Sequence, residues 1–219
     1  MENNRKRNIF IIGSMGLAVV FLVINAWFFK GWVSATLWGF GFTIAYVLYA
    51  IITKDELLGR FLLFAMCAGW IELLPDHWLV AGTKTLIYPA DEPIIDSSPL
   101  YMPFSWLVVF IQIGYIGFLL TQKMGLLKAS IIVTVLGAII IPVYEFLAIK
   151  AGWWSYQNTP TIFTVPYYVI LAEGLLMTTI PFFFKKCETS KWIAIPVLGI
   201  IQGLIMWLCC IIAFALVGK

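Results

Sequence analysis

Carboxylates stand in apolar stretches of this sequence, where an ionisable group is costly to keep. Glu72 and Asp76 are four positions apart, Glu145 ends the run AIIIPVYE, and Glu173 stands within VILAEGLL. Ionisable residues inside a membrane segment are rare and usually mark a functional site. A carboxylic acid in an apolar pocket can stay protonated and act as a donor. We therefore take Glu72, Asp76, Glu145 and Glu173 as candidate catalytic residues for general-acid chemistry.

Glu72 and Asp76 form the closest acidic pair among these candidates. Their spacing places both side chains on one face of a helix, about one turn apart. Two carboxylates held close in a poorly solvated site cannot both ionise easily. We expect Glu72, Glu145 or Glu173 to donate a proton, and Asp76 to position the donor or take a proton back. The alternatives are a solvated Asp76 at the membrane interface, and glutamates that serve only as hydrogen-bonding glue between helices.

Aromatic and amide side chains accompany the carboxylates along the sequence. An aromatic ring face stabilises a nearby cation, and an acid in an aromatic-walled apolar pocket suits carbocation chemistry. The alternative is an aromatic belt at the membrane interface. Gln112, Tyr115 and Gln202 are expected to help line one cavity with the carboxylates. The residues predicted to bind a substrate are Trp78, Tyr88, Trp106, Gln112, Trp153, Trp154 and Tyr156.

The sequence shows no pattern for a metal or a cofactor. The single histidine, His77, cannot build a histidine-rich ligand set, and the four cysteines lack metal-ligand spacing. P-loop, dinucleotide-binding, Ser-His-Asp and Asp-rich magnesium-pyrophosphate motifs are missing as well. We expect no metal and no cofactor. His77 is expected at the membrane interface, or beside Asp76.

The candidate residues must be positioned by the secondary structure around them, and the composition indicates that this structure consists of membrane helices. The 219 residues are 62% hydrophobic and 11% charged, with a mean hydropathy of +0.97, whereas a soluble domain needs far more polar surface. Seven apolar segments are each long enough to cross about 30 Å of hydrocarbon as a helix. We predict an all-α membrane protein with one transmembrane domain, residues 1–219. The predicted helices lie near residues 8–29, 33–53, 60–80, 101–121, 129–149, 163–184 and 192–216.

Basic residues predict how these helices are oriented. With the N-terminus inside, ten of the fourteen basic residues lie on the inner side, and the other four, Lys30, Lys84, Lys150 and Lys219, lie outside. An excess of Lys and Arg marks the cytoplasmic side. We therefore predict an inside N-terminus and an outside C-terminus in a multi-pass protein of the cell membrane, the inner membrane of a bacterium. The expected surroundings are membrane lipid, with no nucleic-acid partner, and the oligomeric state stays open.

Two long segments, residues 81–100 and 151–166, join helices on the predicted outer side. They are rich in aromatic residues and proline, so we expect them to be ordered. The helical hairpins that contain them carry similar residues in the same order, which predicts a parallel repeat. The alternative is chance clustering at the membrane interface. The matched residues are Glu72, Trp78, Tyr88 and Pro103 in the first hairpin, and Glu145, Trp153, Tyr156 and Pro166 in the second.

The stretch YEFLAIKAGWWSYQNTPTIFTVPYYVILAE resembles small membrane enzymes of isoprenoid metabolism. These are the lycopene-cyclase-domain proteins, the carotenoid hydratases and the membrane-bound terpene cyclases. The shared pattern is a helix-borne Glu, an aromatic W-x-Y exit, a Pro and a second Glu on the return helix, which Glu145 and Glu173 match. The resemblance implies a cofactor-independent reaction that begins by protonating an alkene or epoxide. Pro166 is followed by two tyrosines where lycopene cyclases have acidic residues, so the substrate stays open.

The leading functional hypothesis is an enzyme that acts on a hydrophobic isoprenoid small molecule, as a terpenoid or carotenoid cyclase or hydratase. A proton-coupled transporter of small molecules or lipids would use the same carboxylates. Matching broken helices in the two halves would favour such a transporter, and the sequence does not show them clearly. A non-catalytic membrane partner subunit is the third hypothesis.

Overall fold

The computed structural model describes residues 2–219, with side chains from residue 4 onward. Within this range the chain has seven helical spans that are long and apolar enough to cross a membrane, which confirms the predicted number of helices. The spans are Asn4–Phe28, Gly31–Thr53, Glu56–Gly82, Met102–Met124, Leu126–Lys150, Tyr167–Thr189 and Trp192–Val217. The predicted bounds differ from these by a few residues at most ends.

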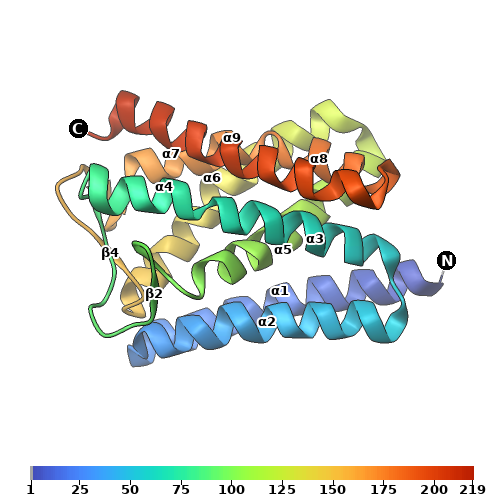
Figure 1. The fold of residues 1–219 in the computed structure, drawn as a ribbon, viewed down its shortest axis with the longest axis horizontal. Helices are drawn as coiled ribbons and strands as arrows, with labels where there is room; N and C mark the ends of the chain where they lie inside the picture. Colours follow the sequence, from blue (N-terminus) through green and yellow to red (C-terminus); the bar gives the residue numbers. More distant parts are fainter. Residues whose placement is uncertain (1) are drawn as a thin grey trace.

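The spans are built from helices that run roughly along one axis of the molecule (Figure 1). α5 is the central helix and packs on α1, α2, α3, α6 and α8, while α9 packs on α3 and α7. We call the end with the N-terminus the N-terminal end, and the opposite end, with the long loops, the loop end. The helices are α1 (Glu2–Phe28), α2 (Gly31–Thr53), α3 (Glu56–Ile71), α4 (Leu73–His77), α5 (Met102–Met124), α6 (Leu126–Lys150), α7 (Tyr167–Met177), α8 (Ile180–Thr189) and α9 (Ile195–Val217).

The third and sixth spans are each interrupted. α3 ends at Ile71, and the span continues as α4 and the π-helix η1 (Trp78–Gly82), while α7 ends at Met177 and α8 begins at Ile180. Proline has no backbone N–H, so it cannot bond to the carbonyl four residues earlier. Pro75 and Pro181 stand four residues after Ile71 and Met177, so each proline accounts for the helix end that precedes it. The last span begins with the short 3₁₀ helix η2 (Trp192–Ala194).

The two long loops are ordered, and they contain short strands that the sequence did not predict. The first holds β1 (Leu86–Ile87) and the hairpin of β2 (Ile94–Ile95) and β3 (Ser98–Pro99). The second holds β4 (Ser155–Tyr156) and the hairpin of β5 (Thr161–Ile162) and β6 (Val165–Pro166). β1 and β4 pair antiparallel and thereby join the loops, with Leu86 opposite Tyr156.

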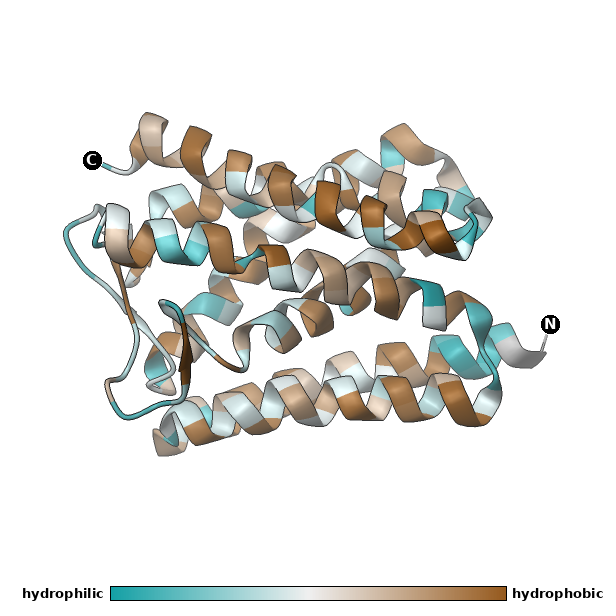
Figure 2. Cartoon of the chain, viewed as in Figure 1, coloured by the Kyte–Doolittle hydropathy of each residue, from teal (hydrophilic) through white to brown (hydrophobic). Residues whose placement is uncertain are grey.

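The surface of the bundle is apolar along the helices (Figure 2). Hydrophobic side chains such as Val19 and Ile139 are more than half exposed, at 59% and 60%. Hydrophilic residues gather in the loops and at the two ends of the molecule (Figure 2). This distribution suits a bilayer, where the helices face hydrocarbon and the ends face water.

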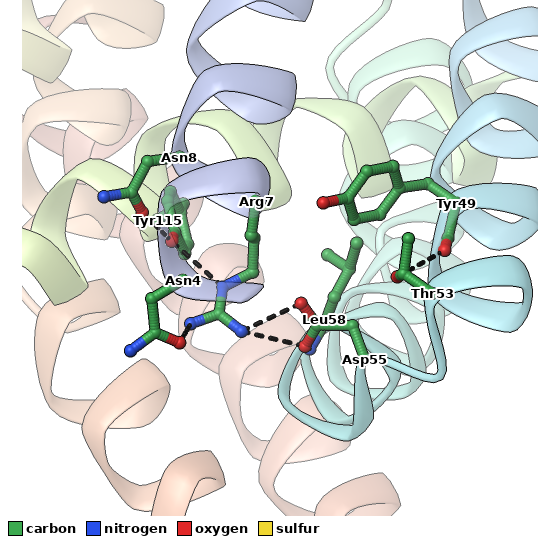
Figure 3. Close-up of polar contacts among 8 residues, drawn as sticks. All are labelled: Asn4, Arg7, Asn8, Tyr49, Thr53, Asp55, Leu58 and Tyr115. Atoms are coloured by element: carbon green, nitrogen blue, oxygen red, sulfur yellow. Dashed lines mark hydrogen bonds and ion pairs between the residues drawn. The ribbon is translucent and has the colours of Figure 1, made fainter. Parts of the chain in front are cut away.

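A buried ion pair ties the N-terminal end together (Figure 3). Nη1 of Arg7 on α1 donates to both carboxylate oxygens of Asp55, at 2.8 and 2.9 Å, and Asp55 also caps α3 by accepting from the Leu58 N–H. Nε of Arg7 donates to the Tyr115 hydroxyl on α5 at 3.0 Å. Tyr115 was expected to line a cavity together with the candidate carboxylates. It does not line that cavity, and its hydroxyl instead accepts from Arg7 and donates to Asn8.

Candidate functional site

The candidate carboxylates are buried and converge on one cavity near the loop end, which we call the acid cavity. Glu72 and Asp76 come from the third span, Glu145 from α6 and Glu173 from α7. The cavity has a volume of about 70 Å³. Glu72 and Asp76 are 3% exposed. Among the residues that the structure describes, no Lys, Arg or His lines it.

The break in the third span positions Glu72 and Asp76. Glu72 is the residue between α3 and α4, and Asp76 lies in the short α4 that follows. The Tyr88 hydroxyl donates to Oδ2 of Asp76 at 2.6 Å, so a loop side chain holds this carboxylate. Oε2 of Glu72 has no hydrogen-bond partner among the described residues. Glu72 is therefore the member of the pair that has an oxygen available to a ligand.

Glu145 is held by the aromatic residues that follow it in sequence. Its Oε2 accepts from Nε1 of Trp154 and from the Tyr156 hydroxyl, both at 2.9 Å. The chain turns back after α6 through Gly152, whose φ of +75° favours glycine. This turn brings Trp154 and Tyr156 over the last turns of the helix. The strand pair of β1 and β4 then fixes the position of Tyr156.

Glu173 has an oxygen available, as Glu72 does. It lies on α7, one turn before the break in the sixth span, and is 7% exposed. Its Oε2 has no hydrogen-bond partner among the described residues. Glu72 and Glu173 both line the acid cavity. An oxygen of each can therefore meet a ligand in one small space.

Aromatic rings form much of the remaining wall of the acid cavity. The predicted residues Tyr88, Trp106, Trp154 and Tyr156 line it, together with Tyr144 and Tyr168, which were not predicted as site residues. Tyr168 is buried and its hydroxyl is 3.0 Å from Oγ1 of Thr85. A sequence signal for both existed, since Tyr144 precedes Glu145 and Tyr168 lies five positions before Glu173.

Trp78, Trp153 and Gln112, also predicted to bind a substrate, do not line the acid cavity. Trp78 packs edge-on against Phe214, and Nε1 of Trp153 donates to Oγ of Ser34 at 2.8 Å. Nε2 of Gln112 donates to the Tyr46 hydroxyl at 3.0 Å. Trp78 is used for packing, and Trp153 and Gln112 donate hydrogen bonds to side chains of α2.

Gln202 and His77 also lie apart from the lining residues. Oε1 of Gln202, which was expected at the cavity, accepts from the Thr179 hydroxyl beside the break in the sixth span. His77 is exposed, and its Nδ1 contacts Asp96 and Ser97 in the first loop. The interface position expected for His77 agrees with this exposure, and Tyr88 is the residue that holds Asp76.

Burial fixes the state of the loop tyrosines that bind the carboxylates. It raises the pKa of Tyr88 well above its usual value, and the nearby Asp76 and Glu72 raise it further. Burial likewise raises the pKa of Tyr156, with Glu145 as the next cause. Both phenols therefore remain protonated and act as fixed hydrogen-bond donors. No group of three or more His, Cys, Asp or Glu residues in the described part of the chain could hold a metal ion.

Comparison with known proteins identifies a family without naming an activity. Residues 73–217 match the family described as Domain of unknown function (DUF6989). The matched region includes Asp76, Glu145 and Glu173 and both long loops. No curated protein and no solved structure matches the chain significantly.

Proposed function

We propose that this chain, which belongs to the family described as Domain of unknown function (DUF6989), is a membrane-embedded enzyme that acts on a hydrophobic isoprenoid. One observation carries the proposal: the buried residues Glu72, Asp76, Glu145 and Glu173 line a single cavity with aromatic walls. Such a site combines a proton donor with ring faces that stabilise a cation. The resemblance of residues 144–173 to isoprenoid cyclases and hydratases agrees with this chemistry.

The reaction begins with proton transfer from a carboxyl group to an alkene or epoxide. With an alkene, the π electrons form the new C–H bond and leave a cation on the neighbouring carbon. A second alkene attacks that cation in a cyclase, and water attacks it in a hydratase. Loss of a proton to a carboxylate completes either reaction. General acid catalysis of this kind typically contributes about 10²–10⁴-fold to a rate.

The hydrogen bonds suggest how the carboxylates share these roles. Glu72 and Glu173 each have an oxygen without a partner, so we assign proton delivery to one of them. Asp76 and Glu145 are held by donors from the loops, so we assign them to positioning the donor and receiving the proton. The proton donors that the sequence suggested included Glu145, and its two hydrogen bonds favour the positioning role.

The decisive experiment is expression in strains that make candidate isoprenoids, followed by extraction and mass spectrometry. We expect a new product from the unmodified protein, and its loss in Glu145→Gln and Glu173→Gln. Glu56→Gln is the matched control, because Glu56 is exposed at the start of α3, away from the acid cavity. Full activity in both cavity variants, with the proteins folded in membranes, would sink the enzyme proposal.

A proton-coupled transporter is the second candidate, and the interrupted spans favour it. Transporter sites near the bilayer midplane are often built from discontinuous helices. Here the third span breaks at Glu72, and the sixth breaks one turn after Glu173. The third span is the first helix of one hairpin and the sixth is the return helix of the other, so the two breaks do not lie at equivalent places in the proposed repeat. Proton uptake into proteoliposomes with no product from any isoprenoid would favour the transporter.

We also propose a parallel repeat that relates the two helical hairpins around the long loops. In each loop a single strand is followed by a β-hairpin that leads into the return helix. In each loop a tyrosine hydroxyl also donates to a carboxylate of the preceding span, Tyr88 to Asp76 and Tyr156 to Glu145. The antiparallel pairing of β1 with β4 fits a two-fold axis along the membrane normal.

The distribution of basic residues supports an inside N-terminus and an outside C-terminus. In a bacterial inner membrane this orientation puts the acid cavity near the outer leaflet. Lys84 lies in the first loop and Lys123 near the end of α5, and both are exposed. We expect a membrane-impermeant maleimide to label Lys84→Cys, but not Lys123→Cys, in intact cells. The reverse pattern would overturn the orientation.

A further inference from the structure

A second cavity lies beside the acid cavity, between α1, α5 and α6, and we call it the apolar cavity. Its volume is about 240 Å³, against about 70 Å³ for the acid cavity. Val109, Ile141 and Tyr144 line both cavities, so the two share a wall or a passage at these side chains. The larger space therefore adjoins the acid cavity at these three side chains.

The walls of the apolar cavity suit hydrocarbon and little else. They consist mainly of aliphatic side chains from α1, α5 and α6. The amide of Gln112 is turned toward Tyr46, to which it donates a hydrogen bond. Among the described residues, no carboxylate or basic side chain lines this cavity. A charged or strongly polar ligand would lose its hydration here without compensation.

The exposure of the lining residues places the mouth of the apolar cavity between α1 and α6. Val19 on α1 is 59% exposed, and Val143 on α6 is 54% exposed. Ala18 and Ile141, which also line the cavity, are buried. Val19 and Val143 belong to spans that are apolar enough to cross a membrane. In a membrane this mouth therefore opens toward lipid chains and away from the aqueous loops.

We propose that the apolar cavity holds the hydrocarbon chain of the substrate and admits the substrate sideways from the bilayer. The acid cavity has room for the reacting end alone, since about 10–15 Å³ of such space takes one water molecule. A linear isoprenoid that is long enough to pass Val109, Ile141 and Tyr144 would fill both spaces. That the bound isoprenoid is a substrate rests on the proposed function. That a hydrocarbon binds in the apolar cavity does not rest on it.

The test uses the full-length protein in membranes and geranylgeraniol that carries a photoactivatable diazirine. Val19→Trp and Val143→Trp each place a large ring at the mouth. Both positions are exposed, so the substitutions should not disturb the packing of the core. Val23→Trp on α1 and Val135→Trp on α6 are the matched controls, because both residues are exposed and neither lines the cavity. The readout is the amount of label on the protein and the peptides that carry it.

We expect label on the lining peptides of α1, α5 and α6. The mouth variants should show about tenfold less of it than the controls, which corresponds to ~1.4 kcal/mol of lost binding. Equal labelling in all four variants, or label spread evenly over the lipid-facing helices, would overturn the proposal. Glu173→Gln should still be labelled. If the cavity is labelled but the protein makes no product, the proposed enzymatic function is refuted and the proposed binding of a hydrocarbon chain is still supported.

Discussion

At the scale of single residues, the hydrogen bonds to Glu145 show how the protein keeps a buried carboxylate in one orientation. Trp154 and Tyr156 both donate to the same oxygen, Oε2, at 2.9 Å. A hydrogen bond to a charged group contributes about 1.5–3 kcal/mol, and an unpaired buried group is costly. The two donors come from one loop, so the order of this loop determines the geometry of the site.

Removing one of these donors should impair the proposed reaction more than the stability of the fold. Tyr156→Phe deletes a hydroxyl and keeps the ring, so Glu145 is left with Trp154 alone. We expect product formation to fall about tenfold, equivalent to ~1.4 kcal/mol, with little change in the amount of folded protein. Product yield by mass spectrometry is the measurement. Tyr167→Phe is the control, because Tyr167 is 44% exposed, and an equal loss there would argue against the role of Tyr156.

Glu92 in the first loop should make stability depend on pH. Burial raises its pKa to about 8, and neither carboxylate oxygen has a hydrogen-bond partner among the described residues, although Tyr101 lies near. The folded state therefore holds a proton that the unfolded chain releases at lower pH, and stability falls as pH rises through about 8. We expect a lower Tm at pH 9 than at pH 6.

The variant Glu92→Gln should flatten this pH dependence, because its amide does not titrate. The comparison is thermal unfolding in detergent at both pH values, for the wild type, Glu92→Gln and the exposed control Glu56→Gln. The control should show the same fall in Tm between pH 6 and pH 9 as the wild type. If Glu92→Gln shows that same fall, groups other than Glu92 cause it.

The sequence predicted the acidic residues of the site better than its aromatic residues. Glu72, Asp76, Glu145 and Glu173 stood out because charge is costly in apolar spans, and the structure brings them together. Trp153 and Trp154 are neighbours of the same type, yet one turns to Ser34 and the other to Glu145. That choice depends on the turn at Gly152 and on strand pairing across two loops, which no local pattern encodes.

At the scale of elements, prolines shape the site by ending helices within the long apolar spans. Pro75 follows Glu72 by three residues, and the carbonyl of Ile71 loses its usual partner there. The long apolar runs predicted each span well, since length and hydropathy are properties of the segment. The short strands were beyond prediction, because two residues carry too little pattern and their partners lie in another loop.

Restoring the helix at Pro75 should move Glu72 out of the acid cavity. Pro75→Ala gives residue 75 an N–H that can bond to the Ile71 carbonyl, and a proline inside a helix costs about 3 kcal/mol relative to alanine. We expect a protein at least as stable as the wild type, with product formation reduced about tenfold or more. Thermal unfolding and product yield are measured together. Full activity in a stable variant would mean that the break does not position Glu72.

At the scale of the whole molecule, the two ends of the bundle have different roles. The loop end holds the acid cavity under paired strands, and the N-terminal end is tied by the ion pair of Arg7 and Asp55 (Figure 3). This ion pair links α1 to α3, and Tyr115 extends the link to α5. α1 also forms one side of the apolar cavity. The ion pair therefore anchors the helix beside which we propose that the substrate enters.

Breaking the ion pair from one side should destabilise the whole bundle. Asp55→Ala leaves the Arg7 guanidinium buried without its partner and removes the cap of α3. We expect a loss of about 3–5 kcal/mol, seen as a lower Tm in detergent. The double variant Arg7→Met with Asp55→Leu should recover part of this loss, because it leaves no uncompensated charge.

Glu188→Gln is the control: it breaks the partly exposed ion pair with Lys185 and should cost at most about 1 kcal/mol. Equal losses in Asp55→Ala and Glu188→Gln would mean that α1 is held by apolar packing alone.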